Sequence, residues 1–250
     1  MIRQGGFVVL PSQISFEAYE FIFSSRRIPR AFLVTVFITA AGTALNLLFT
    51  TMLAYPLSKK AIPGRNAVLF MVVFTMLFTG GMIPLYILVS SLKLIDTYWA
   101  LLLPGLISAF NMLIMKTYFE GLPGELEEAA RVDGCGEIRT LLSIVLPLSM
   151  PIMATLGLFY GVQHWNGYFH AIMFINDKEM MPIQVVLRRM IEVSNVSSEL
   201  EAANPVQIQQ LPPATFKMAA IVVATAPIIV IYPFLQKHFI RGFLLGSIKG

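Results

Sequence analysis

Charged residues are scarce in this chain. Asp, Glu, Lys and Arg together make up 13% of its 250 residues, hydrophobic residues make up 56%, and the mean hydropathy is +0.73. A soluble domain carries about 25% charged residues, which keep its surface hydrated. The composition therefore argues against a water-soluble fold and favours a protein that lies in a membrane.

Five long segments contain no Asp, Glu, Lys or Arg at all. They are Ala31–Ser58, Asn66–Leu92, Thr97–Met115, Thr140–Asn176 and Met218–Gln236. An α-helix rises about 1.5 Å per residue, so about 20 mostly apolar residues cross a bilayer. Each segment reaches or approaches this length, and residues 140–176 exceed it and are expected to continue as interfacial or re-entrant structure. We therefore predict an all-α polytopic membrane protein with five visible transmembrane helices, with buried helices of a large soluble protein as the weaker alternative.

Glycine and proline interrupt two of these segments. Gly80-Gly81 and Pro84 fall within the second, and Pro147 and Pro151 fall within the fourth. Proline removes a backbone donor from a helix, so kinks are expected at these places.

Sequence signals of enzymes and ion-coupled carriers are also missing. The chain has no G-x-x-x-x-G-K-[ST] phosphate loop, so it is not expected to bind ATP itself. The uncharged segments offer none of the ionisable side chains that ion-coupled carriers place in their pathways, nor an acid–base pair or metal cluster for intramembrane hydrolysis. We expect no catalytic residue, no metal ligand and no bound cofactor on this chain.

The cysteine count and the placement of the basic residues also agree with a membrane protein that has no metal or redox site. Cys135 is the single cysteine, so no intramolecular disulfide can form, and a small turn residue is a better interpretation than a redox or metal site. The formal net charge of +4 comes from basic residues that flank the uncharged segments, as at Lys59-Lys60 and Lys237. This arrangement favours contact with membrane lipid and gives no indication of nucleic-acid binding.

One segment stands out because it is polar and acidic. Residues 116–143 contain Glu128-Ala129-Ala130 followed by Gly134. We expect a helix here with Pro123 in its first turn, a Glu127–Arg131 pair, glycine breakers after it, and a second short helix from Glu137. A capped acidic helix on a membrane surface need not bind anything, but one joined rigidly to a transmembrane helix could transmit a push from a soluble partner.

The full spacing of this segment is more specific than its helical pattern. Glu128-Ala129-Ala130 is followed after three residues by Gly134, and after nine more by Ile144-Val145-Leu146-Pro147. This spacing resembles the EAA loop of permease subunits from binding-protein-dependent ABC importers. Further matches are Asn46, Ala54-Tyr55-Pro56-Leu57-Ser58, Gly80-Gly81, His164-Trp165-Asn166, Tyr232-Pro233-Phe234 and Gly246-Ser247-Ile248-Lys249-Gly250. Together they resemble carbohydrate-type permeases, especially those paired with oligosaccharide-binding lipoproteins.

The resemblance implies a type I ABC importer permease fold that forms half of a translocation pathway in the bacterial cytoplasmic membrane. Residues 116–143 would be a cytoplasmic loop whose coupling helix docks into an ATPase subunit. The residues that match the motif are Glu128, Ala129, Ala130, Asp133, Gly134, Ile144, Leu146 and Pro147. The implied partners are a second permease subunit, two ATP-binding subunits that carry ATP and Mg, an extracytoplasmic solute-binding lipoprotein and a carbohydrate.

Members of this family usually have six spans. The first lies upstream of a segment like Phe7–Phe23, so residues 1–30 correspond to the extracytoplasmic segment after it, and residues 31–250 to the permease domain. Translocating Arg26, Arg27 and Arg30 without a preceding span is unfavourable under the positive-inside rule. We therefore expect a longer natural gene product with one more N-terminal span.

Candidate substrate contacts are polar or aromatic residues near the ends of the third and fourth uncharged segments. They are Asn111, Trp165, Asn166 and Tyr168. Aromatic faces and amides can hold a sugar ring, although interfacial anchoring explains Trp165 and Tyr168 as well. His164 and His170 lack a nearby carboxylate and are expected to be structural. A membrane scaffold without a pathway, and a permease for another solute, remain alternatives.

Overall fold

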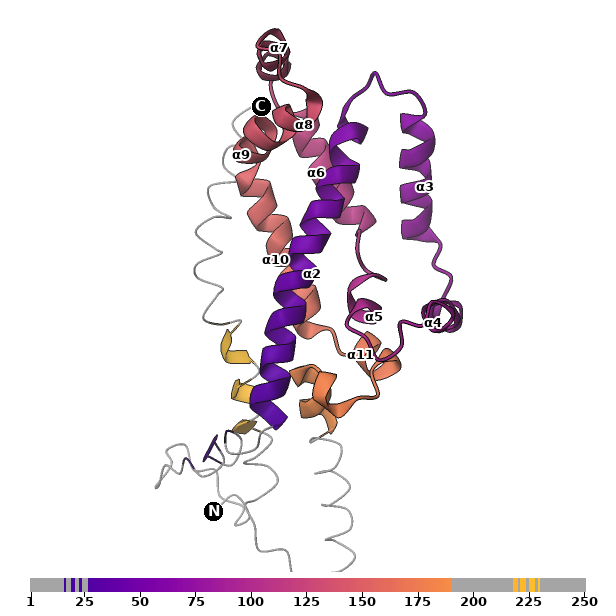
Figure 1. The fold of residues 1–250 in the computed structure, drawn as a ribbon, viewed down its shortest axis with the longest axis vertical. Coiled ribbons are helices and arrows are strands. Elements are labelled where there is room, and N and C mark those ends of the chain that lie inside the picture. Colours follow the sequence, from indigo (N-terminus) through magenta and orange to yellow (C-terminus); the bar gives the residue numbers. More distant parts are fainter. Residues whose placement is uncertain are drawn as a thin grey trace, which may run out of the picture.

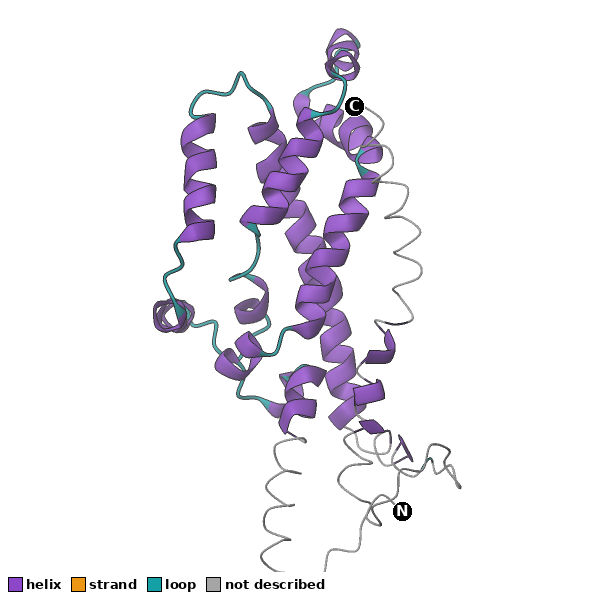
Figure 2. Ribbon diagram, turned by 180° about the vertical axis from the view of Figure 1, so that it is seen from behind, coloured by secondary structure: helices purple, strands orange, loops and turns teal. Residues whose placement is uncertain are grey.

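The computed structural model describes residues 27–189 without a gap, and a few residues on either side of that range. The latter are Phe16, Tyr19, Glu20, Phe23, Met218, Ala219, Ile229 and residues 221–223 and 225–227. Helices are the only regular elements in this described part (Figure 2). Most of the expected N-terminal segment 1–30 and of the expected span 218–236 lie outside it.

The longest helix is α2, which covers Arg27–Ser58 and runs through the centre of the molecule (Figure 1). Its sequence is uncharged from residue 31 onward. Its two prolines, Pro29 and Pro56, lie in the first and last turns, so neither interrupts the hydrogen-bond ladder in the middle of the helix. Among the described residues it is the one helix long and apolar enough to cross a membrane unbroken. The span expected at residues 31–58 is therefore present.

The next two expected spans are broken. Helix α3 (Arg65–Leu77) and helix α4 (Met82–Ser91) are bent by 115° at a break that contains Gly80-Gly81, and Gly81 has a φ of 84°. Helix α5 (Trp99–Leu102) and helix α6 (Ala109–Glu120) are separated by residues 103–108. The prediction of a continuous helix over residues 97–115 is wrong, because Pro104-Gly105 ends the helical ladder there.

The chain then leaves the bundle and returns to it. Helix α7 (Gly124–Val132) projects from one end, and helix α8 (Glu137–Thr140) leads through a π-helical turn at Leu141–Val145 into α9 (Leu146–Leu148). Helix α10 (Met150–Asn166) follows after a bend of 82°, where kinks were expected from the prolines. Counting each bent pair as one span gives up to three spans in the described part.

Short elements close the end opposite α7, which we call the far end. They are α11 (Phe169–Phe174), a 3₁₀ turn η3 (Lys178–Met180) and a helical stretch at residues 183–189. Asp96 ties this end together, because its carboxylate accepts hydrogen bonds from the backbone N–H groups of Asn176 (2.5 Å) and Asp177 (3.0 Å). The N–H groups of Asp177 and Asn176 hold the pKa of Asp96 below its ordinary value.

Helices α2 and α10 pack closely because small residues line their contact. Gly157 and Gly161 form a G-x-x-x-G pair on α10, and a Cβ atom at Gly157 would lie 3.4 Å from Leu47 Cδ1. On α2, Gly42 leaves room for the ring of His164. Small residues at such positions let helix backbones approach in a membrane, where dispersion contacts replace the hydrophobic effect as the driving force.

The break at residues 103–108 is held by polar side chains of the same two helices. The Asn46 amide nitrogen donates to the carbonyl oxygens of Gly105 (2.6 Å) and Leu106 (2.9 Å). His164 Nε2 lies 2.7 Å from the Asn46 amide oxygen, and the Tyr160 hydroxyl accepts a bond from the Ser108 N–H at 3.2 Å. Irregular backbone is tolerated within a membrane only where such partners satisfy it.

We expect Gly42→Ala to destabilise the α2–α10 contact. The added Cβ would lie 2.5 Å from His164 Nε2, and the imidazole ring cannot move aside without breaking its hydrogen bond with Asn46. Overpacking of this kind costs about 1–3 kcal/mol, which outweighs the higher helix propensity of alanine. Thermal unfolding in detergent should show a lower midpoint for Gly42→Ala and little change for Gly80→Ala, whose nearest neighbour would lie at 4.0 Å. Equal midpoints would show that the contact is looser than the structure indicates.

Candidate functional site

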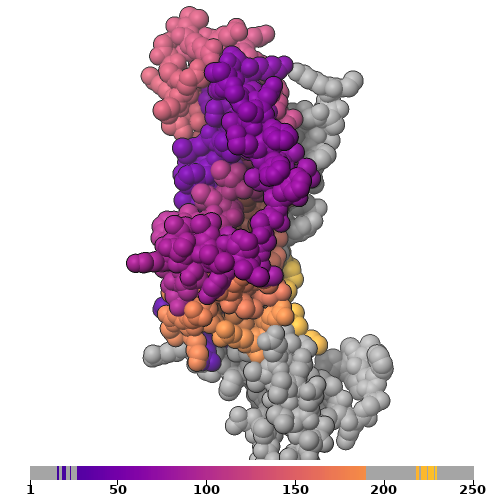
Figure 3. Space-filling view, turned by 90° about the vertical axis from the view of Figure 1, so that its right-hand side faces the viewer, coloured from indigo at the N-terminus to yellow at the C-terminus, as the bar shows by residue number. Residues whose placement is uncertain are grey.

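The candidate site lies in the acidic segment predicted at residues 116–143. We call its residues 121–140 the acidic loop, because α6 continues to Glu120 and the π-helical turn begins at Leu141, and this loop contains α7 and α8. Pro123 lies at the N-cap of α7 rather than inside its first turn, and Glu125 and Glu127 follow it. Acidic residues at this end interact favourably with the helix dipole. The loop projects beyond the rest of the described molecule, so α7 is accessible to a soluble partner (Figures 1 and 3).

Helix α7 ends in a Schellman motif centred on Gly134. The N–H of Cys135 donates to the Ala130 carbonyl at 2.9 Å, and the N–H of Gly134 donates to the Arg131 carbonyl at 3.0 Å. Gly134 has a φ of 77°, a left-handed conformation that side chains with a Cβ rarely adopt. The expectation that Gly134 ends this helix is confirmed, and the turn sets the direction in which the chain enters α8.

Replacing Gly134 by alanine should therefore loosen the turn without affecting the bundle. The left-handed conformation costs a residue with a Cβ about 1–2 kcal/mol, while nothing lies within 4 Å to clash with the new atom. We expect the amides of Gly134→Ala around residues 133–135 to exchange with deuterium about tenfold faster. Gly124→Ala is the matched control, because Gly124 has equally open surroundings and no positive φ. Unchanged exchange in both variants would argue against strain at residue 134.

The charged residues of the loop pair differently from the prediction. Glu127 does not pair with Arg131, four residues away, but with Lys59 at the end of α2. Arg131 Nη2 instead lies 2.9 Å from Glu137 Oε1 at the start of α8. Because Arg131 stands in the last turn of α7, its side chain reaches the next helix across the turn at Gly134.

The motif residues of α7 divide into inward and outward sets. Ala130 is 3% exposed and packs inward, whereas Glu128, Ala129 and Asp133 are exposed. Within the described part of the chain no ion pair or hydrogen bond engages the Glu128 carboxylate. An exposed carboxylate on a projecting helix is available to an external cation.

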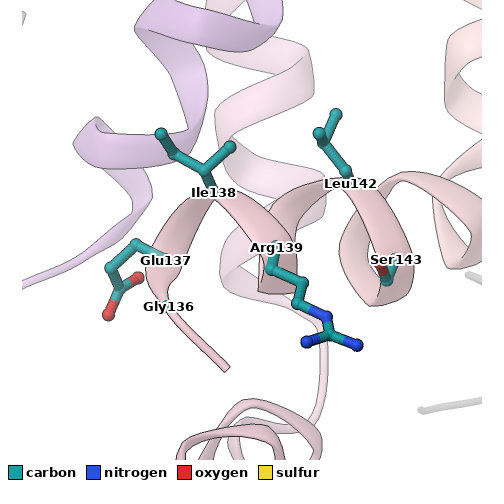
Figure 4. Close-up of a pocket in the computed structure, with 6 residues that line it drawn as sticks. All are labelled: Gly136, Glu137, Ile138, Arg139, Leu142 and Ser143. Atoms are coloured by element: carbon teal, nitrogen blue, oxygen red, sulfur yellow. The ribbon is translucent and has the colours of Figure 1, made fainter. Parts of the chain in front are cut away.

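Exposed apolar side chains accompany these acids. Val132 is 88% exposed and Ile138 is 76% exposed, and Leu142 follows one turn after Ile138. Figure 4 shows Ile138 and Leu142 pointing the same way, while Arg139 points away from them. All three line an open hollow together with Gly136, Glu137 and Ser143. Sequence spacing alone did not single out these apolar residues.

The second half of the motif lies in the π-helical turn and α9. Ile144 and Leu146 are half-buried and join the loop to the bundle, whereas Pro147 is exposed. Val145 between them is 1% exposed and belongs to a core cluster with Met112, Met115 and Leu156. The loop is therefore anchored firmly in the helices.

The four candidate substrate residues do not share one environment. Asn111 on α6 is 5% exposed, and Trp165 on α10 is 6% exposed and packs edge-on against Phe32 at 5.8 Å. Asn166 is exposed, and Tyr168 carries the guanidinium group of Arg188 at 4.8 Å from its ring centre. Only the last two are accessible on the surface of this chain.

Comparison with known proteins identifies the class. The family described as "Binding-protein-dependent transport system inner membrane component" matches residues 47–244, and the chain belongs to this family. It is therefore a multi-pass inner-membrane permease subunit of an ABC importer and not an enzyme. The family predicted from the spacing of the EAA motif is confirmed.

Similar proteins match over almost the whole chain. Protein LplC of Bacillus subtilis (strain 168) is 49% identical over 100% of this chain and 84% of its own length. The polygalacturonan/rhamnogalacturonan transport system permease protein YtcP of the same organism is 48% identical over 98% of this chain and 85% of its own. The crystal structure of a bacterial ABC transporter involved in the import of the acidic polysaccharide alginate contains a chain with 35% identity and a TM-score of 0.87. The match covers 95% of the present chain and 84% of the chain in the alginate importer.

Proposed function

We propose that the chain forms half of the translocation pathway for an oligosaccharide, specifically one rich in uronic acids. The observation that carries this proposal is the 48% identity, over nearly the full chain, to a permease named for polygalacturonan and rhamnogalacturonan transport. The similarity to a chain of an alginate importer supports the same substrate class. All three named polysaccharides are acidic.

The acidic loop is the element that receives energy in this proposal. Glu128 and Asp133 are exposed acidic residues of this loop, and the apolar side chains of Val132 on α7 and Ile138 on α8 are exposed as well. Such a surface fits a cleft of an ATPase subunit that offers cations around an apolar floor. ATP and Mg would bind to two such subunits, while a second permease completes the pathway and an extracytoplasmic binding lipoprotein delivers the solute.

Reconstitution tests this function. Proteoliposomes should contain the chain with its second permease, ATPase subunits and binding lipoprotein, and uptake of radiolabelled trigalacturonate should be compared with that of maltotriose. We expect ATP-dependent uptake of the acidic sugar, and none when the purified chain is reconstituted alone. Uptake of maltotriose only would contradict the acidic substrate, and binding of the partners without uptake of any solute would favour a scaffold.

A further inference from the structure

The connection between α2 and α3, residues 59–64, lies at the same end of the molecule as the acidic loop (Figures 1 and 3). Lys59 opens this connection, and its Nζ atom forms an ion pair with the carboxylate of Glu127 on α7. The same Nζ lies 4.6 Å from the centre of the Tyr55 ring on α2. The Lys59 and Glu127 side chains are only 23% and 14% exposed, so this pair is screened by salt less than an open surface pair.

A second contact joins α2 to the other helix of the loop. The Tyr55 hydroxyl donates a hydrogen bond to Glu137 Oε2 at 3.3 Å, and Glu137 Oε1 accepts one from Arg131 at 2.9 Å. The last turn of α2 and the residue after it therefore hold α7 and α8 together. We call Tyr55, Lys59, Glu127, Arg131 and Glu137 the α2 clamp.

The α2–α3 connection is also held where it enters α3. Arg65 donates from Nε to the Leu57 carbonyl at 2.8 Å and pairs with Glu120 at the end of α6, where Lys116 also lies 2.8 Å from that carboxylate. Burial opposes the charge on Glu120, yet hydrogen bonds and charges from Lys116 and Arg65 hold its pKa below the ordinary value. The connection is thus held at both ends, and in the described structure Lys59 is the one residue of it that forms an ion pair or hydrogen bond with α7.

We propose that Lys59 is a positioning residue that transmits the movement of α7 to α2, an inference that rests on α7 being the docking element for an ATPase. Its ammonium group faces inward and does not contribute to the outward surface around Glu128. Helix α2 runs the length of the bundle and contacts both α6 and α10. A displacement of α7 would therefore be passed through Lys59 to α2, and from α2 to α6 and α10. This route is additional to the Tyr55–Glu137 contact and to the covalent route through α8 and α9.

The test is Lys59→Met in the complete complex with its second permease, ATPase subunits and binding lipoprotein. Solute uptake and ATP hydrolysis should be measured in the same vesicles, and ATPase association by co-purification. We expect association to stay within twofold of the wild type, while uptake per ATP hydrolysed falls at least fivefold. Lys59→Arg should restore most of the ratio, because it keeps the charge beside Glu127.

Two further variants make the result specific. Lys60→Met removes the neighbouring exposed lysine, for which the described part of the chain shows no ion pair, and should leave the ratio unchanged. The exchange Lys59→Glu with Glu127→Lys should recover part of what each single reversal loses. Unchanged uptake per ATP in Lys59→Met, or a loss of ATPase association equal to the loss of uptake, would overturn this inference alone. A wild-type chain that binds no ATPase subunit would overturn the proposed function with it.

Discussion

Glu128→Lys should reduce association with the ATPase subunit about 10–100-fold and reduce transport accordingly. The Glu128 carboxylate is exposed on α7, and reversing its charge places like charges together if the partner cleft is cationic. Insertion and thermal stability of the permease should not change, because in the described structure no contact of the bundle depends on this side chain. The measurement is co-purification of ATPase subunits with the variant, together with ATP turnover stimulated by the binding protein and substrate.

Glu125→Lys is the matched control for this variant. It makes the same charge change on the same helix, one turn nearer the N-terminus, and Glu125 is also exposed. A smaller effect there would show that the position in the motif matters, whereas equal losses would indicate a general electrostatic attraction. Normal substrate-stimulated ATP turnover with Glu128→Lys would refute the role given to this residue.

Asn46→Leu should cause the largest loss of stability. The substitution leaves the carbonyl oxygens of Gly105 and Leu106 without a donor and removes the partner of His164. Each orphaned buried group costs about 1–3 kcal/mol. For a chain of this size the thermal midpoint should fall by about 5–10 °C.

Asn46→Asp separates the two roles of this amide. It keeps an acceptor for His164 but cannot donate to the two carbonyls, so it should be nearly as unstable as Asn46→Leu. Asn66→Leu is the control, because the one side-chain hydrogen bond that Asn66 makes with described residues is an exposed bond accepted from Arg65 at 3.4 Å. If Asn46→Leu unfolds at the wild-type temperature, the break at residues 103–108 does not depend on α2.

Much of this structure could be predicted from the sequence because long uncharged segments and a spaced motif are strong signals. Helix α2, the helix–turn–helix form of the acidic loop and the turn at Gly134 were all expected. The continuity of residues 97–115 was not predicted correctly. Composition reports which residues prefer lipid, but whether Pro104-Gly105 kinks a helix or opens it depends on partners such as Asn46, which lies 59 residues away.

The ion pairs of the acidic loop show a second limit of prediction from sequence. Spacing by four residues made Glu127 and Arg131 possible partners, yet each finds a better one outside its own helix. Local periodicity cannot rank a neighbour on the same helix against Lys59, which is brought to α7 by the tertiary fold. The outward position of Glu128, by contrast, follows from the helical periodicity once Ala130 is buried.

The amide of Asn46 has a consequence for biosynthesis. Its partners at residues 105, 106 and 164 are synthesised well after α2, so α2 enters the membrane before any of them can bond to it. An unpaired amide is unfavourable in hydrocarbon. Until α10 arrives, α2 is best kept beside a polar surface of the insertion machinery. The polar contacts of α2 are therefore completed only when residues 105, 106 and 164, which come later in the chain, have reached it.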